Sequence, residues 1–358
     1  MKVKLEDVCE RGTSNLKQSD IAKTSGDYPI YGASGYIGNA NFYHQEKPYV
    51  AVVKDGAGVG RTALYPANSS VIGTMQYLLP KDNVLPKYLF YVVSYMHLEK
   101  YFTGATIPHI YFKDYKNEEF NLDLLERQAE IVEILEKCEK IIEKRKQEIQ
   151  LLDQLIKARF VEMFGNPVLN DKGWEQKSLG EITTKIGSGA TPKGGKEAYQ
   201  EEGITLIRSM NVHNGQFEYK DLAHISDEQA SKLDNVTIEE DDVLLNITGA
   251  SVARSCVVPN EILPARVNQH VCIIRCKDCI IPEFLNKLLI DDNYQDLLWS
   301  IAGSGATRES ITKQQVENLQ IILPMLELQK EFMAFCHQVT KSKLLEFSSL
   351  QNHTGMLQ

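Results

Sequence analysis

The chain has 358 residues, 43% hydrophobic and 24% charged, which allows two cored domains and excludes a disordered or fibrous protein. Seven cysteines, an odd number, and a start without an apolar secretory core predict an intracellular, cytoplasmic protein. The net charge of −9 excludes general attraction of nucleic acid by the whole surface, so any contact with DNA must be local.

Residues 1–120 are predicted to form a first globular domain of mixed α+β structure. Short β-rich runs, Tyr49–Val53 and Val71–Leu79, are separated by glycine turns, and residues 86–102 form an apolar helical stretch. The longest apolar run, Tyr88–Met96, is half the length of a membrane span, so no membrane association is expected.

Residues 121–166 are predicted to form one long helix, because apolar residues recur with a heptad period. At 1.5 Å per residue, about forty residues make a rod of roughly 60 Å. The apolar seam stabilises the protein only if a second helix covers it, so a coiled coil is expected. The seam residues are Leu135, Cys138, Ile142, Ile149, Leu152, Ile156 and Met163.

An internal repeat supplies the covering helix. Blocks of the first half reappear in the second half, although insertions separate them. The paired blocks are Gly104–Thr106 with Gly305–Thr307, Gln128 with Gln329, and Gly56-Ala57-x-Val59-x-Arg61 with Gly249-Ala250-x-Val252-x-Arg254. The chain is therefore predicted to be a pseudo-two-fold tandem duplication whose two helices run antiparallel.

Residues 167–322 are predicted to form the second α+β domain. Its expected strands lie around Ile204–Ile207, Asp242–Ile247 and His270–Arg275, and a helix is expected over Pro282–Ile301.

Residues 323–358 are predicted to form the second helix, which is shortened or diverged. Its seam carries charges at two core positions, and Gly355 interrupts its helical character. The seam residues are Phe332, Cys336, Val339, Lys343, Glu346 and Leu350. We expect reduced or altered assembly with any partner that docks on a full-length coiled coil.

An ordered set of motifs resembles the specificity subunit of type I restriction-modification systems. In the second half the motifs are Ile207–Val212, Ala265–Val271, Gly303–Thr307 and Leu323-Pro324-x-Leu326-Glu327-x-Gln329; in the first half they are Tyr28–Gly32, Lys54–Ala57 and Phe164–Pro167. The resemblance implies that residues 1–120 and 167–322 are target-recognition domains, each reading one half of a bipartite site in double-stranded DNA. The helices would set the spacer and dock two methyltransferase subunits, and motor-nuclease subunits would join for restriction.

The resemblance also implies that the chain is not an enzyme and holds no cofactor or metal. Its partners would use S-adenosylmethionine for adenine methylation, and ATP and magnesium for restriction.

Residue chemistry selects candidates for DNA contact, because Arg and Lys pair with guanine and phosphate, and Asn and Gln pair with adenine. In the first domain they are Lys54, Arg61, Gln76, His109 and Lys113; in the second they are Lys193, Lys196, Arg208, Asn211, Arg266, Gln269 and Arg308.

Other kinds of site fit the residues less well. The stretch Gly187–Lys196 has the wrong spacing for a phosphate loop, and Pro66 interrupts the helix that a dinucleotide-binding Gly56–Gly60 would need. Cys276 and Cys279, together with Cys272 and Cys256, suggest zinc, but buried cysteines fit the apolar pattern better. Two further alternatives stay open: a coiled-coil scaffold whose domains bind RNA or peptide, and an enzyme with an unrecognised active site.

Overall fold

The computed structural model describes residues 1–21, 25–104, 107–192, 195–303 and 309–355. Within these ranges, residues 20, 196, 198 and 345–355 are described by their backbone alone. The chain divides into two compact units, unit 1 (Met1–Lys146 with Ser348–Gln358) and unit 2 (Gln147–Phe347). Both units contain sheets and helices, which confirms the predicted α+β class. In the described part of the chain, no helix has the length and apolarity needed to cross a bilayer.

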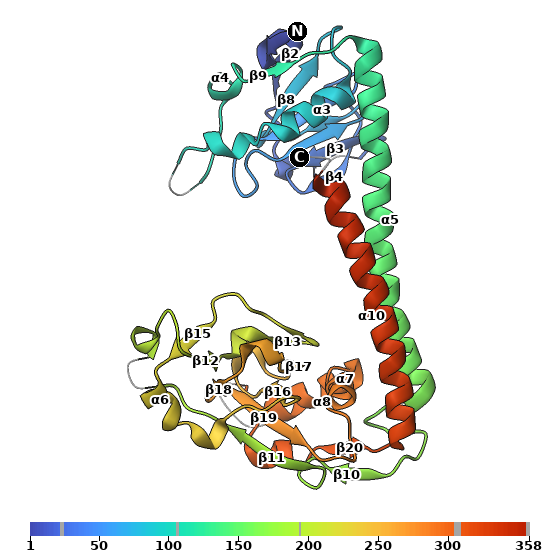
Figure 1. Ribbon diagram of the computed structural model, residues 1–358. Helices are drawn as coiled ribbons and strands as arrows, with labels where there is room; N and C mark the ends of the chain where they lie inside the picture. The colour runs from blue at the N-terminus through green and yellow to red at the C-terminus, as the bar shows by residue number, and fades with distance from the viewer. Residues whose placement is uncertain (22–24, 105–106, 193–194, 304–308, 356–358) are drawn as a thin grey trace. The chain divides into compact units, whose positions relative to one another are not determined.

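Unit 1 is built on two main sheets (Figure 1). The first is antiparallel with the order β2-β8-β5-β6, and the second has the order β4-β3-β7 with β3 and β7 parallel. A two-stranded sheet pairs β1 with β9. The strands are β1 (Lys2–Lys4), β2 (Cys9–Thr13), β3 (Tyr28–Gly32), β4 (Gly35–Ala40), β5 (Tyr49–Val53), β6 (Thr62–Tyr65), β7 (Ser70–Val71), β8 (Met75–Pro80) and β9 (Glu119–Asn121).

The central strand β5 is buried along its whole length, as its unbroken apolar sequence predicts. The helix α3 (Pro86–Tyr95) contacts β5 and buries Tyr88, Leu89 and Val93. The helical stretch expected over residues 86–102 is interrupted, because His97 has a φ of +50° that no α-helix accommodates. The remaining helices of unit 1 before residue 120 are α1 (Leu5–Val8), α2 (Gln18–Ile21), η1 (Leu98–Tyr101) and α4 (Phe112–Tyr115).

Unit 2 repeats these sheets strand for strand. Its four-stranded sheet has the order β11-β19-β16-β17, its three-stranded sheet the order β15-β12-β18 with β12 and β18 parallel, and β10 pairs with β20. An additional hairpin joins β13 and β14. The strands are β10 (Gln176–Ser178), β11 (Thr183–Ser188), β12 (Ile204–Ile207), β13 (Val212–His213), β14 (Gln216–Phe217), β15 (Ala223–Ile225), β16 (Val243–Asn246), β17 (Ser255–Val257), β18 (Ala265–Val267), β19 (Val271–Cys276) and β20 (Gln320–Ile322). The predicted tandem duplication is therefore confirmed at the level of topology.

The helices of unit 2 differ from expectation at one point. The stretch expected as one helix over residues 282–301 is two helices, because the Asp291 carboxylate accepts a 3.0 Å hydrogen bond from the Asn293 amide and starts a new helix there. The helices are η2 (Gly195–Ala198), η3 (Ser209–Asn211), α6 (Asp227–Ser231), η4 (Asp234–Val236), η5 (Gly249–Ser251), η6 (Asn260–Ile262), α7 (Pro282–Leu289), α8 (Asp292–Gly303) and α9 (Lys313–Glu317).

Two long helices, α5 (Leu125–Phe164) and α10 (Leu326–Gly355), complete the chain. In unit 1, Ile131 of α5 packs against the core. In unit 2, Phe160 of α5 lies 5.5 Å from Phe332 of α10 between ring centroids. The helix α10 has 30 described residues against 40 in α5, and it is helical through Gly355, which was expected to interrupt it.

The helices run antiparallel in unit 2, since Arg159 pairs with Glu331 at 2.9 Å and Asp153 pairs with Lys343 at 2.5 Å. The charge at the Lys343 seam position is therefore compensated by Asp153. The predicted seam residues of α5, from Leu135 to Met163, are half-buried, whereas Phe332, Cys336 and Val339 of α10 are buried. The side chains of Glu346 and Leu350 lie outside the described part.

One buried glutamine in each unit makes the same set of hydrogen bonds, so the duplication extends to individual side chains. The Gln128 side chain accepts a hydrogen bond from the Leu85 amide (2.9 Å) and donates to the carbonyls of Asn83 and Asp123. In unit 2 the Gln329 side chain accepts from the Ile281 amide (2.9 Å) and donates to the carbonyls of Cys279 and Pro324. Each glutamine thus ties the start of a long helix to the start of a short one, α3 or α7.

Candidate nucleic-acid interface

In unit 2, three loops meet at the end of β16. The amide of Ile247, just after β16, donates to the His270 carbonyl (3.0 Å), and its carbonyl accepts from the Ile311 amide (2.8 Å). The Gly249 amide donates to the Glu309 carbonyl (2.9 Å). The Thr248 hydroxyl and the His270 ring join the same loops at 2.5 Å. These bonds hold the loops after β16, before β19 and before α9 as one surface.

Unit 1 has the same arrangement at the end of β5. The amide of Lys54 donates to the Thr74 carbonyl (2.9 Å), and its carbonyl accepts from the Ile110 amide (2.9 Å). The Gly56 amide donates to the Pro108 carbonyl (2.9 Å). Each bond corresponds to one in unit 2, so both units present an equivalent loop junction.

Four of the five predicted contact residues of unit 1 lie at this junction. The Lys54 side chain, 27% exposed, lies 3.8 Å from the Asp55 carboxylate. Arg61 is exposed at the end of the turn that follows β5, and His109 belongs to the loop that bridges to Asp55. Lys113 is exposed, with its ammonium 5.2 Å from the Tyr111 ring centroid. Basic and aromatic groups therefore gather on one surface of unit 1.

A tyrosine cluster adjoins Arg61. The rings of Tyr31 and Tyr65 stack at 4.0 Å, and Tyr36 beside them is 62% exposed. Burial and the neighbouring Tyr31 raise the pKa of Tyr65, while the positive charge of Arg61 acts in the opposite direction. Tyrosine hydroxyls and an arginine guanidinium therefore lie next to one another, and both kinds of group can contact DNA.

Three predicted contact residues are instead used inside the fold. Gln76 is buried on β8 and donates a 2.7 Å hydrogen bond to the Gly12 carbonyl. Asn211 is fully buried and donates to the Glu218 carbonyl at 3.0 Å. Arg266 is 9% exposed on β18 and pairs with Asp234 at 2.8 Å. Because these bonds already engage the polar groups that would face a base, the three residues are not part of the interface.

The other candidates of unit 2 divide into two groups. Gln269 is exposed at the loop junction and accepts a hydrogen bond from the Thr191 hydroxyl. Arg208 follows β12, donates to the Asp221 carbonyl and places its guanidinium 5.4 Å from the Tyr199 ring centroid. Lys193 and Arg308 lie outside the described residues, as does the side chain of Lys196.

Arg254 is a residue of the junction that the choice by residue chemistry missed. It is half-exposed and occupies the position in unit 2 that Arg61 occupies in unit 1. The repeat of Gly56-Ala57-x-Val59-x-Arg61 as Gly249-Ala250-x-Val252-x-Arg254 is the signal that identifies it in the sequence.

The cysteines that suggested zinc are buried or half-buried, and all seven are free thiols. Burial raises the pKa of both Cys272 and Cys276 to about 12, which disfavours the thiolate form that binds zinc. Among the described residues, no group of His, Cys, Asp and Glu is arranged to hold a metal ion.

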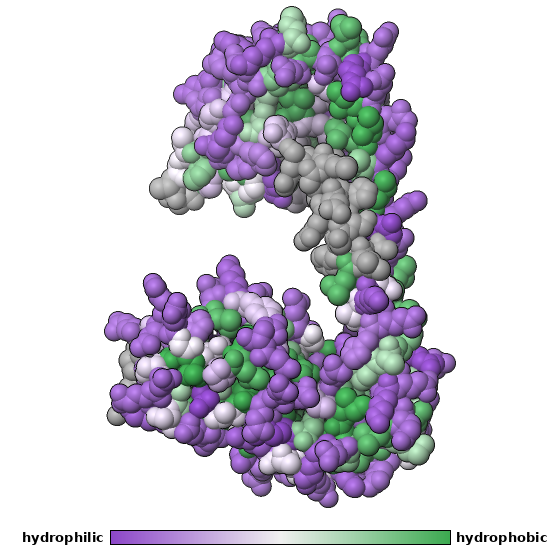
Figure 2. Space-filling view, viewed as in Figure 1, coloured by the Kyte–Doolittle hydropathy of each residue, from purple (hydrophilic) through white to green (hydrophobic). Residues whose placement is uncertain are grey.

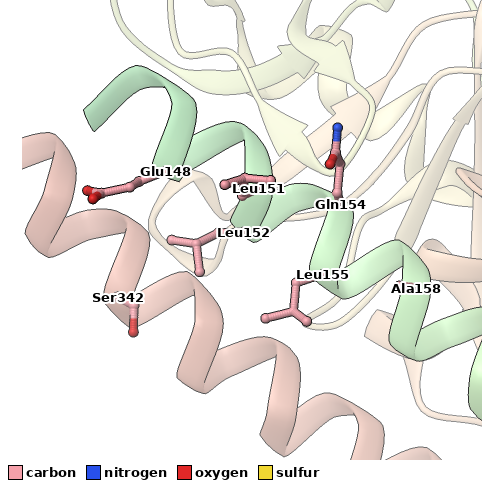
Figure 3. Close-up of a pocket in the computed structure, with 7 residues that line it drawn as sticks. All are labelled: Glu148, Leu151, Leu152, Gln154, Leu155, Ala158 and Ser342. Atoms are coloured by element: carbon pink, nitrogen blue, oxygen red, sulfur yellow. The ribbon is translucent and has the colours of Figure 1, made fainter. Parts of the chain in front are cut away.

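A second candidate surface lies on the long helices of unit 2. Figure 2 shows apolar surface on this helical part, where Leu151 is 61% and Leu155 is 47% exposed. A groove of about 630 Å³ is lined by Glu148, Leu151, Leu152, Gln154, Leu155, Ala158 and Ser342. In Figure 3, Leu152 and Leu155 extend from α5 towards α10, and Gln154 points away from it. Such exposed apolar area is typical of a protein-binding site.

Comparisons with known proteins agree with this arrangement. The type I restriction enzyme MjaIX specificity subunit of Methanocaldococcus jannaschii is 25% identical over 278 residues, which cover 71% of this chain and 62% of that protein. The putative MjaX specificity subunit of the same organism is 22% identical over 338 residues, covering 88% and 72%. The chain thus spans less than two thirds of the length of the MjaIX subunit.

Solved structures share the fold. The S subunit of a type I restriction-modification system from M. genitalium matches with a TM-score of 0.61 at 15% identity, covering 100% of this chain and 93% of that one. A chain from a study of complex assembly and conformational transition in the type I system matches with a TM-score of 0.63 at 18% identity, covering 100% and 95%. Residues 1–152 and 171–351 match the family described as the type I restriction modification DNA specificity domain. The resemblance seen in the motifs is therefore confirmed, and the chain belongs to this family.

Proposed function

We propose that the chain is the DNA sequence-specificity subunit of a type I restriction-modification complex and acts in the cytoplasm of a prokaryotic cell. Each unit reads one half of a bipartite site in double-stranded DNA, and the continuous helix α5 sets the separation of the two halves. The observation that carries this proposal is the duplication of the loop junction, bond for bond, in two units joined by that helix.

The mechanism is positioning without chemistry in this chain. Polar side chains of each junction, among them Arg61 in unit 1 and Arg254 and Gln269 in unit 2, contact phosphates and base edges, which fixes the register of the complex on the duplex. Two methyltransferase subunits that dock on the helices transfer a methyl group from S-adenosylmethionine to adenine. Motor-nuclease subunits use ATP and magnesium for restriction. Altered assembly with these partners stays a prediction.

The net charge of −9 limits DNA contact to such local surfaces. A scaffold that binds RNA or peptide uses the same helices but shows no sequence-dependent binding of duplex DNA. A gel shift of duplex DNA that weakens with salt and depends on sequence therefore separates the two functions.

The decisive experiment is to co-express the chain with a cognate methyltransferase subunit and to map adenine methylation across a genome. We expect a bipartite motif. Replacing residues 174–320 with the corresponding segment of another family member should change one half of the motif and leave the other half unchanged. Methylation that is unaltered by this replacement would falsify the proposal.

A further inference from the structure

The turn after β5 holds Arg61 in a defined place. The Val53 amide donates to the Arg61 carbonyl and the Gly60 amide donates to the Val53 carbonyl, both at 2.8 Å. Gly60 has a φ of +87°, a conformation that glycine adopts without steric cost. The backbone therefore fixes the direction in which the Arg61 side chain leaves the turn.

The turn after β16 repeats these bonds around Arg254. The Asn246 amide donates to the Arg254 carbonyl (2.8 Å), and the Ala253 amide donates to the Asn246 carbonyl (2.9 Å). Ala253 has a φ of +70° although it carries a Cβ, a conformation that costs on the order of 1 kcal/mol or more. Such strain persists only where the surrounding structure determines the backbone, so Arg254 is placed as firmly as Arg61.

Neither arginine is committed to an ion pair. Within the described part of the chain, no carboxylate lies within salt-bridge distance of Arg61 or Arg254. Four other arginines are paired with carboxylates: Arg127, Arg159, Arg266 and Arg275. In a chain with a net charge of −9, two uncompensated guanidinium groups at equivalent junctions are available for an anion.

A purely structural role does not account for the repeated residue. The Arg61 guanidinium donates to the carbonyls of Ala57 and Gly58 at 3.3 Å, but among the described residues Arg254 makes no side-chain hydrogen bond. The two turns nevertheless have the same backbone bonds. The turn therefore forms without the guanidinium. The recurrence of arginine at this position is then explained by a partner outside the chain.

We propose that Arg61 and Arg254 are equivalent phosphate anchors, one for each half of the DNA site. The inference rests on the proposed function. The two units would read different base sequences, so a residue that recurs at the same backbone position in both must contact what the two half-sites share, which is the phosphate backbone. The planar guanidinium, which donates two parallel hydrogen bonds, suits a phosphate.

The test uses the complex purified after co-expression with the methyltransferase subunit. Binding is measured on a duplex with the mapped motif and on one with a scrambled motif, at several salt concentrations. We expect Arg61→Gln and Arg254→Gln each to weaken binding on the order of five-fold on both duplexes and to reduce the salt slope by about 0.9. Arg61→Lys and Arg254→Lys should retain the slope, because they retain the charge.

Arg127→Gln is the matched control, since it removes the same charge from an exposed residue that is paired with Glu130, and it should leave the salt slope unchanged. Loss of binding on the motif duplex alone would assign a base contact and overturn the proposal. An unchanged slope in both glutamine variants, with unchanged thermal stability, would also overturn it. Wild-type complex that binds neither duplex overturns the proposed function itself, which distinguishes the two failures. Because Arg254 makes no side-chain hydrogen bond in the described part, Arg254→Gln tests binding without a folding defect.

Discussion

Gln329 shows how a single side chain can hold two helices of unit 2 together. It is fully buried and satisfies one backbone amide and two backbone carbonyls. A buried polar group that loses its partner costs about 1–3 kcal/mol. The repeat-equivalent Gln128 does the same in unit 1.

We predict that Gln329→Leu lowers the free energy of unfolding of unit 2 by about 3 kcal/mol, because it orphans the Ile281 amide and two carbonyls. Chemical denaturation followed by circular dichroism measures the change. Gln338→Leu, the same substitution at an exposed position of α10, should stay within about 0.5 kcal/mol of wild type. Equal stability of the two variants would contradict the role assigned to Gln329.

Residue chemistry predicted what kinds of contact the chain can make but not which side chains are free to make them. Three residues carry groups that can bind a base, yet they are buried: Gln76, Asn211 and Arg266. Whether such a side chain is exposed depends on which side of the backbone faces the core. That side is decided by pairing with strands far away in the sequence. The position of Arg254, in contrast, could be predicted from the repeat, because equivalent positions in the two halves occupy equivalent places in the fold.

At the scale of elements, periodic or apolar segments were predictable and short polar ones were not. The prediction of strands is confirmed for Tyr49–Val53 and Ile204–Ile207, whose apolar runs are buried, and the heptad period predicted α5. The strand β2 (Cys9–Thr13) was not predicted, because its sequence is mostly polar and exposed and it is ordered by pairing with β8. Sequence patterns report local preference, whereas such strands depend on distant partners.

The groove on α5 leads to a prediction about assembly. If it docks a methyltransferase subunit, Leu151→Glu and Leu155→Glu place a charge in an apolar interface and should reduce the yield of the co-purified complex at least about ten-fold. Affinity co-purification followed by size-exclusion chromatography measures the yield.

Leu169→Glu provides the matched control, because Leu169 is 75% exposed and lies outside the long helices. We expect normal complex yield from it. Normal yield from the Leu151 and Leu155 variants as well would exclude this groove as the docking surface.

At the scale of the whole molecule, the boundary between the two units lies within the long helices. The division between the units falls between Lys146 and Gln147, inside α5, and between Phe347 and Ser348, inside α10. A helix resists bending and changes length by 1.5 Å per residue, so its length can encode a distance.

We predict that inserting seven residues at both division points changes the spacer of the methylated motif by about three base pairs, since about 10 Å of helix corresponds to three steps of 3.4 Å. The half-sites should not change. A heptad is chosen because it preserves the facing of the seam to within roughly 20°. Genome-wide methylation mapping gives the result.

The control for this prediction keeps Ile142 and replaces the other six residues of 140–146 with different helix formers, and thus leaves the length unchanged. Its motif should match that of the wild type. A spacer that stays the same after the double insertion would show that the helices do not determine the separation of the half-sites.

The pairing of β10 with β20 brings the two ends of the globular part of unit 2 side by side, with Gln176 opposite Ile322. The chain enters and leaves this part through these two paired strands, which form a stem. Genetic recombination with a related gene at the two stem positions can therefore graft a foreign specificity onto the same helical frame in one event. Such an exchange replaces the recognition surface of unit 2 in one step and leaves the sequences of both long helices unchanged.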